Sequence, residues 1–170
     1  MDSIAITIKD ALVAWGIPHQ LITSLISMIP LLELRGSILV AGFLKLPLIQ
    51  TYLSAVIGNM IPIPFILLFI EKIFKLLKQS KHFSKLPIWL EKKALKKADQ
   101  INKYGYLGLF LFVAIPLPGT GAWTGSLLAV LLGMKRGKSL FFIFLGVMGA
   151  GLIMSLVMSL VSYGVIGSFI

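Results

Sequence analysis

The sequence predicts an all-α integral membrane protein made of two inverted repeats, each a re-entrant helical hairpin followed by a transmembrane helix, with amphipathic surface helices. Of its 170 residues, 58% are hydrophobic and 13% are charged, whereas a soluble domain carries about 25% charge. The net charge of +10 comes from basic clusters between apolar runs, which is typical of loops on the cytoplasmic side of a membrane. Proline and glycine also lie inside the apolar runs, where an ordinary span would be unbroken.

The first segment, 1–17, contains apolar residues on one helical face and charges elsewhere. It is too short and too charged to cross about 30 Å of hydrocarbon. An amphipathic helix at the membrane interface is therefore predicted.

The first repeat is predicted over 18–70, with a hairpin over 21–46 and a span over 47–70. The hairpin region is apolar but contains a proline and a Glu-x-Arg sequence near its middle, and we expect it to enter from the outside. The span contains the sequence IPIP at 61–64. Each of these prolines removes a backbone donor and clashes with the preceding turn, so a helix break is expected there.

A basic segment follows at 71–103, and its apolar residues recur at helical spacing. It contains ten lysines: Lys72, Lys75, Lys78, Lys81, Lys85, Lys92, Lys93, Lys96, Lys97 and Lys103. This pattern predicts a cytoplasmic amphipathic helix or helix pair, whose lysines at 72–103 bind anionic lipid headgroups.

The second repeat is predicted over 104–170, with a hairpin over 104–134 and an outward span over 139–168. If 104–134 crossed the membrane once, the basic residues 135–138 and the preceding basic segment would lie on opposite sides. A hairpin that enters and leaves on the cytoplasmic side removes this conflict. Its turn is PLPGTGAWTG at 116–125, which must be buried in protein or line a wet cavity, because non-helical backbone is not stable in lipid.

Two short sequences support a repeat. RGSILVAGFLK begins at Arg35 and TGSLLAVLLGMK begins at Thr124, with one extra residue in the second copy, and Ile-Pro precedes both. A chance match between two apolar segments is the alternative. Inverted repeats with broken helices are typical of secondary transporters, which bind substrate at the repeat interface.

Glu33 and Arg35 are charged residues at membrane depth, where charges are costly and usually face a pathway or each other. Residues two apart on a regular helix point to different sides, so a direct bond between them needs an irregular backbone. One interpretation is a structural ion pair that fixes the hairpin tip. The other is that Arg35 holds an anionic group and that Glu33 carries a proton, because burial favours the protonated carboxyl group. The two interpretations are compatible.

The PGTG sequence is the second candidate site. Gly119 and Gly121 permit unusual dihedral angles, and Thr120 and Thr124 supply hydroxyl groups. A helix that restarts after this sequence would direct free N–H groups at an anion or a lipid headgroup. The alternative is close helix packing, since Gly121 and Gly125 have small-x-x-x-small spacing.

The remaining candidates are polar or aromatic residues of the spans. Asn59 is expected to bond a neighbouring helix or the broken backbone at Pro62 rather than a substrate, and Trp123 to line a cavity. The complete candidate set for substrate or proton binding is Glu33, Arg35, Gly36, Asn59, Pro118, Gly119, Thr120, Gly121, Trp123 and Thr124. The chain has no cysteine and no nucleophile–base pair or ligand cluster, so no enzyme activity, cofactor, metal or nucleic-acid partner is expected.

Three longer sequences, PLLELRGSILVAG at 30–42, GNMIPIPF at 58–65 and PLPGTGAWTGSLLA at 116–129, resemble the small multidrug export protein family. The resemblance implies a multi-pass protein of the prokaryotic inner membrane.

The arrangement is also similar to the DedA superfamily, whose members have paired opposed re-entrant hairpins and include lipid and undecaprenyl-phosphate transporters. This similarity implies Glu33 and Arg35 at one tip, and Pro118, Gly119 and Thr120 at the other. The second tip lacks the arginine that DedA proteins carry there.

Three functions are therefore considered. The first is a secondary transporter or exporter of a small amphipathic or anionic substrate, coupled to protons through Glu33. The second is a lipid or polyprenyl-phosphate translocase or scramblase, and the third is a non-transporting membrane scaffold. A chain this small has little protein to shield two hairpins, so a homodimer is also expected.

Overall fold

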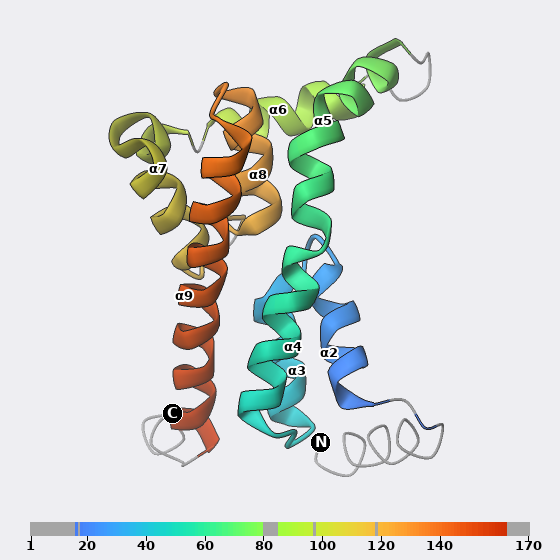
Figure 1. The fold of residues 1–170 in the computed structure, drawn as a ribbon, viewed down its shortest axis with the longest axis vertical. Helices are drawn as coiled ribbons and strands as arrows, with labels where there is room; N and C mark the ends of the chain where they lie inside the picture. Colours follow the sequence, from blue (N-terminus) through green and yellow to red (C-terminus); the bar gives the residue numbers. More distant parts are fainter. Residues whose placement is uncertain (1–15, 17, 80–84, 97, 118, 163–170) are drawn as a thin grey trace. The chain divides into compact units, whose positions relative to one another are not determined.

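The computed structural model describes residues 16, 18–79, 85–96, 98–117 and 119–162 (Figure 1). The predicted interfacial helix at 1–17 and the last residues of the predicted span at 139–168 lie outside this part of the chain. Within it, every regular element is an α-helix. The helices are α2 (His19–Met28), α3 (Glu33–Phe43), α4 (Leu48–Met60), α5 (Pro62–Gln79), α6 (Lys85–Leu95), α7 (Asp99–Ala114), α8 (Ala122–Leu131) and α9 (Arg136–Ser162).

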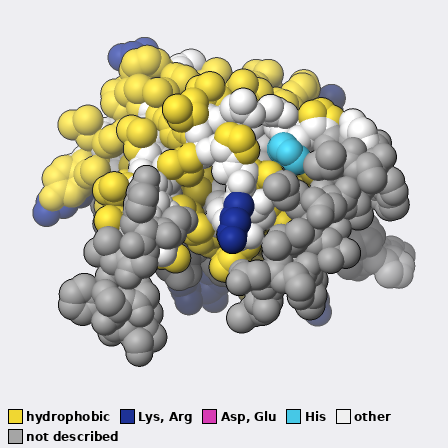
Figure 2. All heavy atoms as spheres, turned by 90° about the horizontal axis from the view of Figure 1, so that it is seen from below, with side chains coloured by type: hydrophobic (Ala, Val, Ile, Leu, Met, Phe, Trp, Pro, Cys, Tyr) yellow, Lys and Arg dark blue, Asp and Glu magenta, His cyan; other side chains and the backbone are white. Residues whose placement is uncertain are grey.

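In the described part of the chain, two stretches are long and apolar enough to cross a membrane. They are Leu48–Gln79, with 32 residues, and Arg136–Val161, with 26 residues. The outer face of α4 shows how apolar their surfaces are, since Ile49, Leu53 and Ile57 are all exposed at four-residue spacing. Hydrophobic side chains predominate among the coloured side chains in Figure 2, and no acidic one is visible on the face drawn. Such continuous apolar surface is unfavourable in water, so this is a membrane protein.

The helix break expected at the IPIP sequence is present. Helix α4 ends at Met60 and α5 begins at Pro62, a first helical position that suits proline because its N–H would have no helical partner. Helix α5 then continues to Gln79, beyond residue 70, where the sequence analysis ended the span. No proline or glycine follows Pro64 in this helix, so nothing in the backbone ends it at the first lysines.

The chain divides into two compact units, and the first comprises Met1–Met60 and Met148–Ile170. Helices α2, α3 and α4 pack on one another in it. The C-terminal part of α9 belongs to the same unit, where the Tyr52 hydroxyl donates to the Met148 carbonyl over 3.3 Å.

Helices α2 and α4 run parallel and lie unusually close. Three bonds set their register: Gln20 to Gln50 at 2.8 Å, Thr23 Oγ1 to Ser54 Oγ at 2.6 Å, and Ser24 Oγ to the Ser54 carbonyl at 2.8 Å. One turn later the backbones touch at Gly58. A Cβ atom on that glycine would lie 2.5 Å from Ser24 Cα and 2.7 Å from its carbonyl carbon.

The second unit comprises Ile61–Val147. Helix α8 packs on α5, α6 and α7 in it. A Cβ atom on Gly125 would lie 2.8 Å from Val113 Cγ2, so α7 and α8 are also in close contact. Two ion pairs connect helices of this unit. Lys78 Nζ of α5 lies 2.8 Å from Glu91 Oε2 of α6, and Arg136 of α9 lies 3.5 Å from Glu71 of α5.

The two units contain the same helix corner. After α3, the Leu46 N–H donates to the Ala41 carbonyl over 2.9 Å, and after α8 the Met134 N–H donates to the Ala129 carbonyl over 2.9 Å. This is the Schellman arrangement. Its left-handed residue is Lys45 in the first copy, with φ +54°, and a glycine with φ +65° in the second.

Aligning the two corners pairs residues of the first unit with residues of the second. Lys45 corresponds to Gly133 at the same chain separation that relates Thr51 to Ser139 and Gly58 to Gly146. The helix before the corner has 11 residues in the first copy and 10 in the second. The sequence alignment instead placed one extra residue in the second copy, which paired Lys45 with the later Lys135.

Candidate functional site

The predicted residues Glu33, Arg35 and Gly36 begin helix α3 in the first unit. Glu33 is only 6% exposed and has φ +49°, a left-handed conformation that is uncommon for any residue but glycine. The irregular backbone expected at this charged pair is thus present, and the charges of Glu33 and Arg35 interact. Gly36 makes the tight turn possible, since a Cβ atom there would lie 2.8 Å from Leu32 Cβ.

Asn59 lies near the end of α4, in the same unit, and its side chain is 2% exposed. Its Oδ1 atom has no hydrogen-bond partner in the described part of the chain. The break that follows leaves a further acceptor without its usual donor, because Pro62 has no N–H to donate to the Gly58 carbonyl.

A set of buried hydroxyl groups on α2, α3 and α4 was not among the residues predicted from the sequence. The buried hydroxyl residues of these helices are Thr23, Ser27, Ser37, Thr51 and Ser54. Several connect the helices: the Ser37 hydroxyl of α3, for example, donates to the Thr23 carbonyl of α2 over 2.7 Å. The four-residue spacing of Thr23 and Ser27 within an apolar run was the available signal, because it places both on one helical face.

The second predicted group surrounds the loop before α8, in the second unit. Pro118 lies outside the described residues. Gly119 and Gly121 have φ of +75° and +129°, so both adopt backbone conformations that favour glycine. The Thr120 hydroxyl lies 2.9 Å from the Ile115 carbonyl and 2.8 Å from the Leu117 carbonyl. These contacts stabilise the loop itself, and a role of Thr120 in ligand binding stays a prediction.

The first turn of α8 carries the last two predicted residues, Trp123 and Thr124, and both are half-buried. The next polar group, Ser126, is fully buried and donates to the Ala122 carbonyl of its own helix over 2.6 Å. The contact of Gly125 with Val113 supports the packing interpretation of that glycine.

The structure therefore places Glu33, Arg35, Gly36 and Asn59 in the first unit. The loop residues Gly119 to Thr124 are together in the second. The expectation that these two groups face one substrate pathway stays a prediction.

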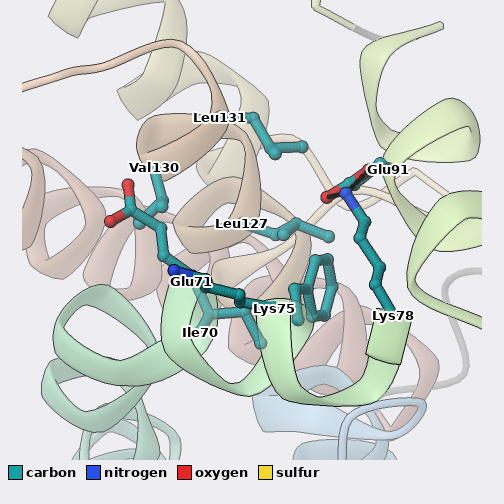
Figure 3. A pocket seen from close by; sticks show the side chains of 9 residues that line it. Ile70, Glu71, Lys75, Lys78, Glu91, Leu127, Val130 and Leu131 are labelled. Carbon is teal, nitrogen blue, oxygen red and sulfur yellow. Dashed lines mark hydrogen bonds and ion pairs between the residues drawn. The ribbon is translucent and has the colours of Figure 1, made fainter. Parts of the chain in front are cut away.

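A pocket that the sequence analysis did not anticipate lies in the second unit (Figure 3). It has a volume of about 260 Å³ and is formed by α5, α6 and α8. Its apolar lining is Ile70, Phe74, Leu127, Val130 and Leu131, and its charged lining is Glu71, Lys75, Lys78 and Glu91. Figure 3 shows Lys78 and Glu91 directed at each other from α5 and α6.

The residues described here contain no group of three or more His, Cys, Asp or Glu that could hold a metal ion. Neither the curated proteins nor the solved structures contain a detectable match to this chain.

A family model described as "Putative small multi-drug export protein" matches residues 33–153. The matched region includes the Glu-x-Arg sequence, the IPIP break, the loop before α8 and most of α9. By its description this is a family of exporters and not a class of enzymes. Because the match covers well over half of the sequence, the chain belongs to the small multi-drug export protein family.

Proposed function

We propose that the protein is a secondary exporter of the prokaryotic inner membrane that moves a small amphipathic or anionic substrate and couples its movement to protons through Glu33. One observation carries the proposal. In a chain of an exporter family, a carboxylate lies almost completely buried at the irregular start of a short helix. Ionisable groups within membrane segments are expensive and usually mark a pathway.

Helix lengths support a pair of re-entrant hairpins. Helices α2, α3 and α8 contain 10, 11 and 10 residues, so each is about 15 Å long at 1.5 Å per residue. That is about half of the hydrocarbon core. Each pair, α2–α3 and α7–α8, is joined by a proline-containing connection that would turn within the membrane.

The shared Schellman corner supports an internal repeat. In both copies a short helix ends in this corner, and a stretch long enough to cross a membrane follows it, Leu48–Gln79 in the first copy and Arg136–Val161 in the second. The basic residues after Glu71 and those at the start of α9 belong on the cytoplasmic side by the charge rule, which gives the two copies opposite orientations in the membrane. Inverted repeats of this kind surround the substrate sites of many secondary transporters.

Glu33 and Arg35 have different roles in this proposal. The guanidinium group of Arg35 binds the anionic part of a substrate, for which its planar fork is suited. Glu33 exchanges a proton, and its charge state changes how strongly Arg35 holds that group. The hydroxyl groups on α2, α3 and α4 keep the surrounding helices in register.

Replacing Glu33 with glutamine is expected to abolish transport driven by a proton gradient, because the amide keeps the shape of the side chain but cannot release a proton. The measurement is uptake of two amphipathic probes, the anion 8-anilinonaphthalene-1-sulfonate, which carries a group that Arg35 can bind, and the cation ethidium, into proteoliposomes with an acidic interior. We expect at least a tenfold fall in the gradient-dependent initial rate.

The matched control is Glu71→Gln, since Glu71 is an exposed acidic residue of α5 whose contact with Arg136 is 3.5 Å long. Its variant should transport at the wild-type rate. Undiminished proton-driven flux in the Glu33 variant would remove this carboxyl group from the mechanism.

A lipid translocase or scramblase is the second candidate function, and helix α6 favours it. Its exposed side chains include Ile88 and Trp89 beside lysines, a combination that suits a membrane interface. The pocket between α5, α6 and α8 lies beside this helix. In this proposal the lysines at 72–103 gather anionic headgroups, and two copies of the chain enclose the lipid path.

Fluorescent-lipid flip assays separate the two candidates. Lipid movement without any gradient, stopped by Arg35→Ala, would establish the translocase and reject the exporter. Absence of both lipid movement and flux of either probe would leave a membrane scaffold.

A further inference from the structure

Three buried side-chain oxygen atoms of the first unit have no hydrogen-bond partner within the described residues: Ser27 Oγ, Asn59 Oδ1 and Ser155 Oγ. Ser27 and Asn59 lie near the ends of α2 and α4, whereas Ser155 lies on α9. Ser27 and Asn59 are 0% and 2% exposed, so bulk water does not reach their side chains. Leaving a buried polar group unpaired costs about 1–3 kcal/mol. Two such atoms at neighbouring helix ends therefore indicate a ligand that accepts their lone pairs.

The helix contacts place both atoms at the same end of the unit. The Ser37 hydroxyl bonds the Thr23 carbonyl, and one turn from this bond toward the α2–α3 connection lie Glu33 on α3 and Ser27 on α2. On the other side of α2, Gly58 touches the Ser24 backbone, and Asn59 is the next residue of α4. The Glu33 carboxylate, the Ser27 hydroxyl and the Asn59 amide oxygen therefore lie at the same height along the helix axes. We call this height, at the C-terminal ends of α2 and α4, one level of the unit.

The backbone makes this level favourable for a cation. Helices α2 and α4 run parallel and end here, at Met28 and Met60, so two partially negative helix ends meet. The Gly58 carbonyl has also lost its helical donor, because residue 62 is proline. Helix α3 begins at the same level with its positive end, and the Glu33 charge in its first turn offsets that end.

We propose that this level of the first unit is a sodium site, with Asn59 Oδ1, Ser27 Oγ and the Gly58 carbonyl as ligands and the Glu33 carboxylate beside them. All of these are oxygen atoms, which hard cations prefer. A monovalent ion fits the charge better than a divalent one, since a single carboxylate is present and Arg35 already interacts with it. Broken helices with unwound carbonyls and helix C-termini are where transporters bind sodium.

A role for sodium as a coupling ion in export rests on the proposed function. The binding site itself does not, because it follows from the buried oxygen atoms and the helix ends. Binding can therefore be measured without any flux.

The test compares thermal unfolding of the purified full chain in sodium chloride and in choline chloride at equal ionic strength. A ligand that binds only the folded state raises the melting temperature, by about 5 °C near saturation for a chain of this size. The shift should saturate with sodium concentration. Equal melting temperatures in the two salts would overturn the proposal.

Three variants locate the site. Asn59→Leu and Ser27→Ala should each lose the sodium-dependent shift. Ser155→Ala should keep it, because Ser155 on α9 also has an unpartnered buried hydroxyl oxygen but does not belong to the proposed site. A shift retained in both the Asn59 and the Ser27 variants would place sodium elsewhere and overturn the assignment.

Sodium-23 NMR line broadening by the wild-type protein, relative to the Ser27→Ala variant, provides a second measurement if the Asn59 variant does not fold. No difference in broadening would also count against the site. Sodium binding without flux of either probe would reject the exporter and leave the sodium site standing. Probe flux without sodium binding would reject the sodium site and leave the exporter standing.

Discussion

Replacing Gly58 with alanine is expected to separate α2 from α4 and to lower the melting temperature of the detergent-solubilised protein by about 6–12 °C. The added Cβ atom would lie 2.5 Å from Ser24 Cα and 2.7 Å from its carbonyl carbon. These are backbone atoms, which cannot rotate away as a side chain can. Overpacking of this kind costs about 3 kcal/mol, and each kcal/mol lowers the melting temperature by about 2–4 °C in a protein of this size.

Two other glycines provide matched controls for this change. A Cβ atom on Gly137 would meet nothing within 4 Å, so Gly137→Ala should leave the melting temperature unchanged or raise it slightly. A Cβ atom on Gly42 would meet the end of the Met158 side chain, which is flexible, so Gly42→Ala should have a smaller effect. If the Gly58→Ala and Gly137→Ala variants had the same melting temperature, the close approach of α2 and α4 would be wrong.

Replacing Gly121 with alanine is the second change with a large expected effect. Gly121 precedes α8 with φ +129° and ψ −177°, a region that is essentially restricted to glycine. A side chain there costs on the order of 1–3 kcal/mol and would pull the loop away from the start of α8. We expect a lower melting temperature and a loss of ethidium flux, measured on the same preparation.

The neighbouring Gly119 provides the contrast. Its φ of +75° lies near the left-handed region that asparagine also visits, so Gly119→Asn should retain most of the wild-type melting temperature. Wild-type stability and flux in the Gly121 variant would show that the loop takes a different conformation in the working protein.

The broken helices were the part of the fold that the sequence specified most directly. Pro62 cannot donate a helical bond, and the proline and glycine residues before α8 cannot sustain a helix, so both interruptions follow from the chemistry of the residues present. The irregular backbone at Glu33 followed from a geometric conflict, because two charges two residues apart cannot meet across a regular helix.

The hydroxyl contacts and the pocket could not be predicted in the same way. A serine in an apolar helix has no preferred partner until the register of its neighbours is known. The register of α2 and α4 is set by the three bonds between them and by the close contact at Gly58. The corner at Lys45 was missed because lysine is not the residue expected in a left-handed position. The hydrogen bonds of the two corners and the positive φ angles of Lys45 and Gly133 show that both corners have the same conformation.

The first unit is discontinuous, and this affects how the protein is made. Residues 1–60 leave the ribosome long before Met148, whose carbonyl accepts the Tyr52 hydroxyl bond. The partners that α3 and α4 find on α9 do not exist until translation is nearly finished. The earliest helices therefore lack their contacts with α9 until the last part of the chain has been synthesised.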